Sequence, residues 1–159
     1  MTIDEKALGP DHPGVAKTLN NMALAHKNLE EYPEARALLE RALAIKEGLH
    51  GPDHLELVES LRILGNLLAA ARDLDRAEAV MTRGLAIVEG RHGSVHAEAA
   101  LLLNNLGNVF FYRGDLHRAR SHYLRSLRIE ERLRPPSKER LIHTLHNVAL
   151  VNGRLGNYR

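Results

Sequence analysis

The tetrapeptide Gly9-Pro10-Asp11-His12 returns unchanged as Gly51-Pro52-Asp53-His54. Related words follow as Gly93-Ser94-Val95-His96 and, more degraded, as Pro135-Pro136-Ser137-Lys138. Each step is 42 residues (51 − 9, 93 − 51 and 135 − 93), with no gap. A fixed, ungapped period of this length is the sequence signature of a repeat protein. We therefore expect a single array over 1–159, cut from a longer one, of about three and a half units: the tail of a preceding helix in 1–8, repeats 9–50, 51–92 and 93–134, and a partial repeat 135–159.

Within each repeat the apolar residues follow the helical period rather than the alternation of a strand. One helical face of the first segment carries Val15, Leu19, Met22, Ala23 and His26. A second stripe carries Ala35, Leu38, Leu39, Ala42, Ile45 and Leu49. Pro13 and Pro33 suit the first turn of a helix, where a missing N–H costs nothing. The sequence thus predicts two helices per repeat, with a break near residues 29–31 and a stop at each repeated loop.

Small residues recur in the middle of the first helix, at Ala23, Gly65, Gly107 and Ala149. Glycine is costly inside a helix, so we expect the second helix of the same repeat to cross there at close approach. Ala35, Ala77 and Ala119 are the expected other side of that contact. Because one hairpin cannot bury its stripe alone, stacked antiparallel hairpins are predicted, which is an all-α fold of the α-solenoid type.

The composition excludes several classes of protein. None of the 159 residues is cysteine, which excludes a disulfide framework, thiolate metal sites and a cysteine nucleophile. The longest apolar runs, 67–71 and 99–103, are far shorter than a membrane span. The first six residues include acidic side chains and no apolar core, unlike a signal peptide. A cytoplasmic protein is the resulting expectation.

A known family matches these features. The spacing Leu103-x2-Leu106-Gly107-x2-Phe110, followed by Ala119-x3-Tyr123, resembles the tetratricopeptide (TPR) signature. The 42-residue period, the Gly-Pro-Asp-His-Pro word and the stretches 19–23 and 41–47 narrow the resemblance to the kinesin-light-chain-like subfamily. Four residues depart from this pattern. Glu30 and Arg72 stand in the inter-helix turn, where the other two repeats have Gly114 and Gly156. His26 and Asn152 occupy a position that is usually apolar or aromatic. The resemblance implies a superhelical scaffold for protein–protein interaction, with no cofactor.

The resemblance also implies a concave groove lined by the first helix of each repeat. Its residues in this chain are Lys17, Asn20, Leu24, Lys27, Asn28, Glu59, Arg62, Asn66, Leu101, Asn104, Asn108, Phe111, Tyr112, His143 and His146. Asparagine side chains can hold the backbone of an extended peptide, and the basic residues can bind carboxylates. Phe111 and Tyr112 suit an apolar anchor. We expect a protein or peptide ligand, acidic and with one large apolar residue. The competing interpretation is that some asparagines, notably Asn21, Asn105 and Asn147, repeat because they bond within the array.

Other functions have weaker support. His50-x3-His54 and His92-x3-His96 have the spacing of helical metal ligands, but they straddle a loop and no acidic residue or cysteine completes a set, so no metal is expected. The segment 113–140 carries nine basic and four acidic residues but lacks interleaved aromatics, so nucleic-acid binding through it is kept only as a lower alternative. No phosphate loop, Gly-x-Ser-x-Gly or His-Glu-x-x-His occurs, and no catalytic residue is assigned.

The alternative function is a structural spacer or self-assembling arm of a larger signalling protein. The helix expected over 138–155 would expose Leu141, Leu145, Val148 and Leu155 as one stripe. An exposed apolar stripe favours self-association.

Overall fold

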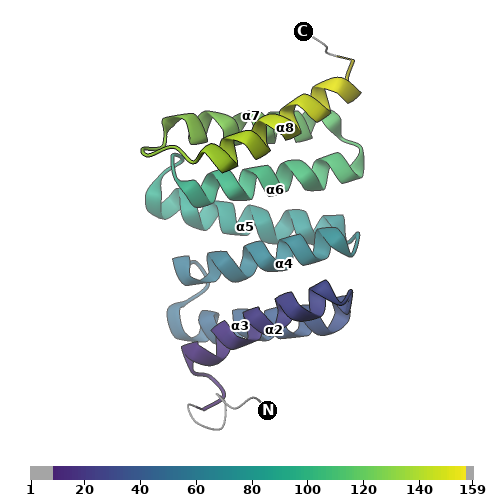
Figure 1. Cartoon of the computed structure of the whole chain (residues 1–159). Coiled ribbons are helices and arrows are strands. Elements are labelled where there is room, and N and C mark those ends of the chain that lie inside the picture. The colour runs from purple at the N-terminus through teal and green to yellow at the C-terminus, as the bar shows by residue number, and fades with distance from the viewer. Residues whose placement is uncertain (1–8, 157–159) are drawn as a thin grey trace. The chain divides into compact units, whose positions relative to one another are not determined.

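A computed structural model describes residues 9–156 of the chain. Within these residues all regular structure is helical (Figure 1). The elements are α2 (Pro13–Asn28), α3 (Tyr32–His50), the short 3-10 helix η1 (Leu55–Leu57), α4 (Val58–Ala70), α5 (Leu74–His92), α6 (Ala97–Arg113), α7 (Leu116–Arg132) and α8 (Lys138–Arg154). The prediction of an all-α fold with two helices per repeat is confirmed, and each break or stop falls at its expected loop.

The chain divides into two compact units, with the boundary between Val80 and Met81 inside α5. In the first unit, α2 and α3 form an antiparallel hairpin and α4 packs against α3 (Figure 1). In the second unit, α6 and α7 form the hairpin and α8 packs against α7. Each unit therefore stacks a further helix on a helix hairpin, as an α-solenoid does. The helix tail predicted for residues 1–8 lies outside the described residues.

The repeated histidine begins the helices. The Nδ1 atom of His12 accepts a 3.0 Å hydrogen bond from the backbone N–H of Gly14. His54 and His96 accept in the same way, each at 3.3 Å, from the N–H groups two residues ahead. A side chain that satisfies an otherwise orphaned N–H group is a helix N-cap. The histidine of the repeated word thus has a structural role in three successive repeats.

The turns inside the repeats all use a left-handed backbone residue. Gly114 and Gly156 have φ values of 86° and 74°, and Glu30 and Arg72 have 61° and 66° at the same register. Glycine adopts this conformation freely, whereas a residue with a Cβ atom is strained there. The two departures from the family pattern therefore keep its turn geometry at an energetic cost.

The other two departures also have visible consequences. His26 Nδ1 lies 2.6 Å from Glu31 Oε2, so this histidine joins the end of α2 to the turn instead of filling the core. Asn152 has a buried Oδ1 atom with no hydrogen-bond partner among the described residues. Packing at this register is therefore polar in the first and last repeats.

The close approach predicted at the small residues is present at Gly107. A Cβ atom on Gly107 would lie 2.4 Å from Cε1 of Tyr123, so the ring of Tyr123 occupies the space that glycine leaves. The three nearest atoms belong to Tyr123, and the expected partner, Ala119, is buried in the same cluster, four residues earlier on α7.

No helix within residues 9–156 combines the length and the apolar character needed to cross a membrane.

Candidate functional site

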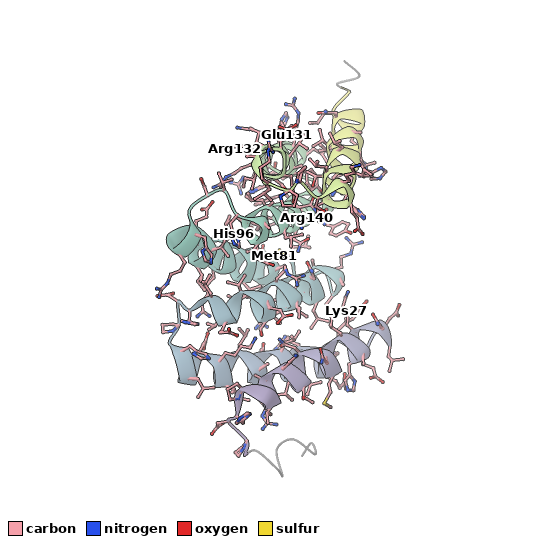
Figure 2. The ribbon with its side chains drawn as sticks, turned by 60° about the vertical axis from the view of Figure 1, so that its left-hand side comes forward. Lys27, Met81, His96, Glu131, Arg132 and Arg140 are labelled. Carbon is pink, nitrogen blue, oxygen red and sulfur yellow. The ribbon has the colours of Figure 1, made fainter. Side chains whose placement is uncertain are left out.

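In the first unit, most of the predicted groove residues lie at the surface of the two first helices. On α2, Lys17, Leu24 and Asn28 are exposed and Lys27, labelled in Figure 2, is half-buried. On α4, Glu59 is exposed, and Arg62 and Asn66 are half-buried. Three basic residues and one acidic residue thus accompany an exposed leucine on this face.

Asn20 is the exception in this set. Its side chain is only 3% exposed, and its Nδ2 donates a 2.9 Å hydrogen bond to Ser60 Oγ on α4. Ser60 Oγ in turn lies 3.2 Å from Asn20 Oδ1. A buried amide satisfied on both sides holds two first helices together and is not available to a ligand. Asn20 therefore belongs to the packing of α2 on α4, and not to an accessible surface.

In the second unit, α6 carries Leu101, Asn104, Asn108 and Phe111 half-buried and Tyr112 exposed, while His143 and His146 are exposed on α8. Asn147 Nδ2 donates a 3.0 Å hydrogen bond to Asn104 Oδ1, which confirms that Asn147 bonds within the array. Tyr123 donates to Asn108 Oδ1 at 2.8 Å. Two of the predicted ligand-binding asparagines therefore also support the fold, which makes them poor choices for a clean test of binding.

A cavity of about 150 Å³ brings three of the predicted residues together in the second unit: Leu101, Asn104 and His143. Thr144, Glu139 and Arg140 of α8 and Glu130 of α7 also line it. Glu130 is buried, and Arg140 Nε donates to both its carboxylate oxygens, at 2.9 and 3.1 Å. No sequence pattern points to this ion pair, because the two residues lie ten positions apart across a loop and follow no repeat.

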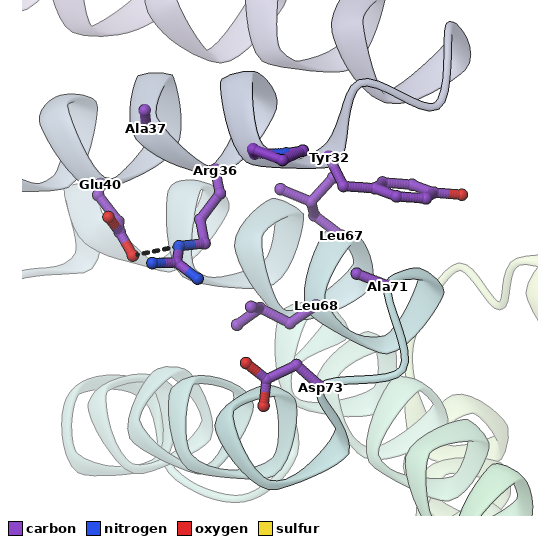
Figure 3. A pocket seen from close by; sticks show the side chains of 9 residues that line it. Tyr32, Arg36, Ala37, Glu40, Leu67, Leu68, Ala71 and Asp73 are labelled. Carbon is purple, nitrogen blue, oxygen red and sulfur yellow. Dashed lines mark ion pairs between the residues drawn. The ribbon is translucent and has the colours of Figure 1, made fainter.

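A second cavity, of about 410 Å³, lies between α3 and α4 in the first unit (Figure 3). Buried Leu67 and Leu68 of α4 line it, together with Tyr32, Pro33, Arg36, Ala37, Glu40, Ala71 and Asp73. Glu40 forms an ion pair with Arg36 at 3.1 Å and accepts a hydrogen bond from Arg76 at 2.9 Å. The cavity is therefore apolar inside with an ion-pair network at its edge, and no predicted residue lines it.

Aromatic and cationic side chains gather where α6 ends. Arg154 of α8 lies over the ring of Phe111 at 4.6 Å, and Tyr112 meets that ring edge-on at 6.3 Å. Arg113 and Arg118 lie over the neighbouring Phe110 at 5.5 and 5.4 Å. Such cation–π contacts hold a guanidinium in place beside an apolar surface. An exposed aromatic ring beside a guanidinium held in place can contact an apolar side chain that has a negatively charged neighbour.

Most arginines of the basic segment 113–140 have acidic or backbone partners within the fold. Arg118 pairs with Asp115, Arg125 with Glu89 and Arg140 with Glu130. Arg134 donates to the carbonyl groups of Glu131 and Leu133. An arginine that pairs with a carboxylate adds little net positive charge, so Arg118, Arg125 and Arg140 contribute little to phosphate binding. Arg132 and Glu131, labelled in Figure 2, are consecutive exposed residues of opposite charge at the end of α7.

The histidine pairs are stacked rings. His50 and His54 lie 4.7 Å apart and His92 and His96 lie 4.4 Å apart, centroid to centroid and nearly parallel. Within residues 9–156 no group of three or more histidine, aspartate or glutamate side chains is arranged to hold a metal ion.

The apolar stripe expected on α8 differs in its members. Val148 and Leu155 pack against the cluster of Phe110, Ala119, Tyr123 and Val151, so they are not exposed as predicted. Leu145 is exposed, Leu141 is half-buried, and Ile142 and Leu150 are exposed instead. The stripe is rotated because α8 packs on α6 and α7 through the side that carries Val148 and Val151.

Comparison with known proteins supports this interpretation of the fold. The family model for the tetratricopeptide repeat matches residues 1–47, 14–90 and 98–159. The crystal structure of BtubC (BKLC) from P. vanneervenii is similar with a TM-score of 0.84 and 21% identity, over 92% of this chain and 59% of that one. The chain thus spans less than two thirds of that relative. No curated protein matches the sequence.

Two further crystal structures contain nearly identical TPR-like repeats of the kinesin light chain type from Podosopora anserina. One, a point variant, has a TM-score of 0.80 and 20% identity, over 92% of this chain and 69% of that chain. The other has a TM-score of 0.78 and 20% identity, over 98% of this chain and 74% of that chain.

The fold and the site together define a helical-hairpin repeat protein. The chain belongs to the tetratricopeptide repeat family, as the sequence predicted, and its fold is similar to that of a putative kinesin light chain with TPR-like repeats. Tetratricopeptide repeats generally mediate protein–protein interactions and typically form non-catalytic scaffolds.

Proposed function

We propose that this chain is a non-enzymatic, cytoplasmic protein-interaction module whose first-helix faces bind an extended acidic peptide with an apolar anchor. The observation that carries the proposal is the combination of Lys17, Leu24 and Lys27 on α2, where cations flank an exposed leucine. Charge-assisted hydrogen bonds to carboxylates are stronger than neutral ones, and the leucine offers apolar area to a neighbouring side chain.

The second unit supports the same chemistry. Tyr112 is exposed beside Phe111, and Arg154 is held over the Phe111 ring. Interfaces tend to concentrate their binding energy on tyrosine, arginine and similar side chains near apolar surface. Each unit therefore offers cations next to an apolar contact, and a ligand can use either unit.

The test uses the full chain and a fluorescein-labelled peptide in which glutamates surround one phenylalanine. Lys17→Glu combined with Lys27→Glu should weaken binding at least tenfold, since two attractions become repulsions. Arg132→Glu is the control, because it makes the same change of charge at an exposed residue of α7. It should leave the affinity for the peptide within about twofold. A peptide with lysine in place of glutamate should not bind.

Equal affinity of the double variant and the unaltered chain for the acidic peptide would contradict the proposal. Equal binding of the lysine peptide would contradict it too, since the face would then not discriminate by charge. Helical circular dichroism identical in all variants ensures that the fold is unchanged.

A further inference from the structure

The cavity of about 410 Å³ between α3 and α4 has the size of a small-molecule site, and it lies within the first unit. The buried part of its lining is apolar, since Leu67 and Leu68 of α4 are 1% and 2% exposed (Figure 3). Ala37 and Ala71 also line it and are exposed, so the cavity opens to solvent. None of the residues of the proposed peptide site lines it. The cavity is therefore a separate place where a ligand can bind.

The repeat register supplies a second observation. One repeat after Leu68, α6 has Phe110, and the guanidinium of Arg118 lies over its ring at 5.4 Å. The residue at the register of Arg118 in the first unit is Arg76, and an aspartate three residues earlier pairs with each of these arginines. The second unit thus supplies its own aromatic ring near this arginine. The first unit has a leucine at that register, with a cavity beside it.

The polar edge of the cavity determines what kind of ligand fits. Arg36 Nε lies 3.1 Å from Glu40 Oε1, and Arg76 donates to the same oxygen at 2.9 Å. The Arg36 side chain points from α3 toward Leu68 (Figure 3), so the flat face of its guanidinium can contact an aromatic ring. The carboxylate of Asp73 also lines the cavity and can accept a hydrogen bond from an N–H group. The two cations and two carboxylates at this edge balance, which favours a neutral ligand over an ion.

We infer that this cavity binds a free, neutral, planar aromatic heterocycle that carries an N–H group, of which indole is an example. The ring packs on Leu67 and Leu68 with one face toward the Arg36 guanidinium, and its N–H donates to the Asp73 carboxylate. Removal of the ring from water supplies most of the affinity. The cation and the acceptor select an aromatic N–H compound over an aliphatic one. A free molecule is the occupant because the paired charges at the edge leave no net charge to attract a charged polypeptide.

The probe is indole, titrated into the full chain with isotope-labelled leucine methyl groups and followed by NMR. Saturable shifts of the Leu67 and Leu68 methyl signals are expected. Ala37→Phe and Leu68→Phe should each weaken binding by tenfold or more, because the added ring takes volume that the ligand needs. Arg36→Met keeps an apolar side chain and removes the cation, so it should weaken binding by about threefold. Arg41→Met makes the same change at an exposed residue of α3 that does not line this cavity, and it should leave the affinity unchanged.

Two related compounds test which features of the ligand matter. 1-Methylindole keeps the ring and lacks the N–H group, so it should bind at least threefold more weakly than indole. N-acetyltryptophanamide carries the ring on a peptide-like group and should also bind more weakly. Tighter binding of this compound than of indole would show that the ring arrives on a polypeptide, which overturns the assignment to a free molecule.

The inference is overturned if indole causes no saturable shifts in the unaltered chain, or if 1-methylindole binds as well as indole. Equal binding of indole to Ala37→Phe and Leu68→Phe would overturn it too. Ala37 is exposed, so Ala37→Phe remains informative even where Leu68→Phe lowers the helicity of the chain. These outcomes do not depend on the acidic-peptide proposal, because the two sites share no residue.

Discussion

The phenol of Tyr123 on α7 donates a 2.8 Å hydrogen bond to Asn108 Oδ1 on α6, while its ring fills the space beside Gly107. One buried side chain thus joins the two helices of a hairpin through a polar and a steric contact. Replacing Tyr123 by phenylalanine keeps the ring and removes the hydroxyl. The expected loss is about 1 kcal/mol of unfolding free energy, the net value of one hydrogen bond, measured by urea denaturation at neutral pH.

The same residue makes stability depend on pH in the alkaline range. Burial raises the pKa of the Tyr123 phenol, and the nearby Tyr112 adds to the shift. Because the folded state holds this proton more tightly than the unfolded state, stability is fully present below the ordinary tyrosine pKa of about 10 and falls as the pH rises above it. The unfolding free energy of Tyr123→Phe should fall less over that range. Parallel alkaline curves for the two proteins would contradict this.

The Gly107 contact predicts a substitution and its rescue. Gly107→Ala should destabilise the protein by about 1–3 kcal/mol, because the added methyl group overlaps the buried ring of Tyr123. Adding Tyr123→Leu should recover much of this loss, since it reproduces the alanine and leucine of the first repeat at Ala23 and Leu39. Thermal unfolding of the single and double variants gives the coupling between the two sites.

Gly48→Ala is the control for the effect of helix propensity. A Cβ atom at Gly48 of α3 would have no neighbour within 4 Å. Alanine is preferred over glycine within a helix by up to about 1 kcal/mol, so this variant should be stabilised, the opposite sign to Gly107→Ala. A loss of stability in both variants would mean that the contact with Tyr123 does not cause the effect of Gly107→Ala.

The strained turn at Glu30 predicts a stabilising substitution. Glu30 has φ of 61° where two of the four equivalent turns have glycine, so Glu30→Gly should relieve strain worth about 1 kcal/mol, less the entropy that glycine adds to the unfolded chain. The net gain is expected to appear as an increase in Tm. Gly114→Ala, which imposes strain at the same register, should lower it. A lower Tm for Glu30→Gly would contradict the left-handed turn.

The histidine caps predict a further effect on stability. His96→Ala should cost about 1 kcal/mol, because the N–H of Glu98 loses its acceptor at the start of α6. His96→Asp should restore or exceed the original stability, since a carboxylate both caps the helix and interacts favourably with its dipole. If His96→Asp and His96→Ala were equally destabilised, the stacking on His92 rather than the cap would be the main contribution.

Much of the fold follows from the sequence because its determinants are local and periodic. The 42-residue register places Pro13, His12 and the turn residues where the structure has them, since helix starts and stops depend on nearby residues. The sequence did not point to the ring of Tyr123 beside Gly107, because the period identifies a helix face but not how far a side chain reaches across to the next helix.

The candidate site was less predictable for the same reason. Register placed Asn20 on the first-helix face, but its bond to Ser60 depends on how α4 sits on α2. The exposed apolar stripe on α8 was predicted to include Val148 and Leu155, whose burial depends on the packing of α8 against α6 and α7. The pairing of Arg140 with Glu130 follows no period at all, so only the structure reveals it.

That ion pair gives the last prediction. Glu130 is 1% exposed and both its oxygens accept from Arg140, so Arg140→Met would leave a buried carboxylate without its cation. Removal of one partner of a buried pair is strongly destabilising, and solvent access to Arg140 reduces the expected loss to about 2 kcal/mol in urea denaturation. Combining it with Glu130→Leu should recover most of this loss, because an apolar pair needs no compensation. Arg132→Met, on the exposed part of the preceding helix, should change stability by no more than about 0.5 kcal/mol. A double variant no more stable than Arg140→Met would show that Glu130 has a second role, in the cavity beside Asn104 and His143.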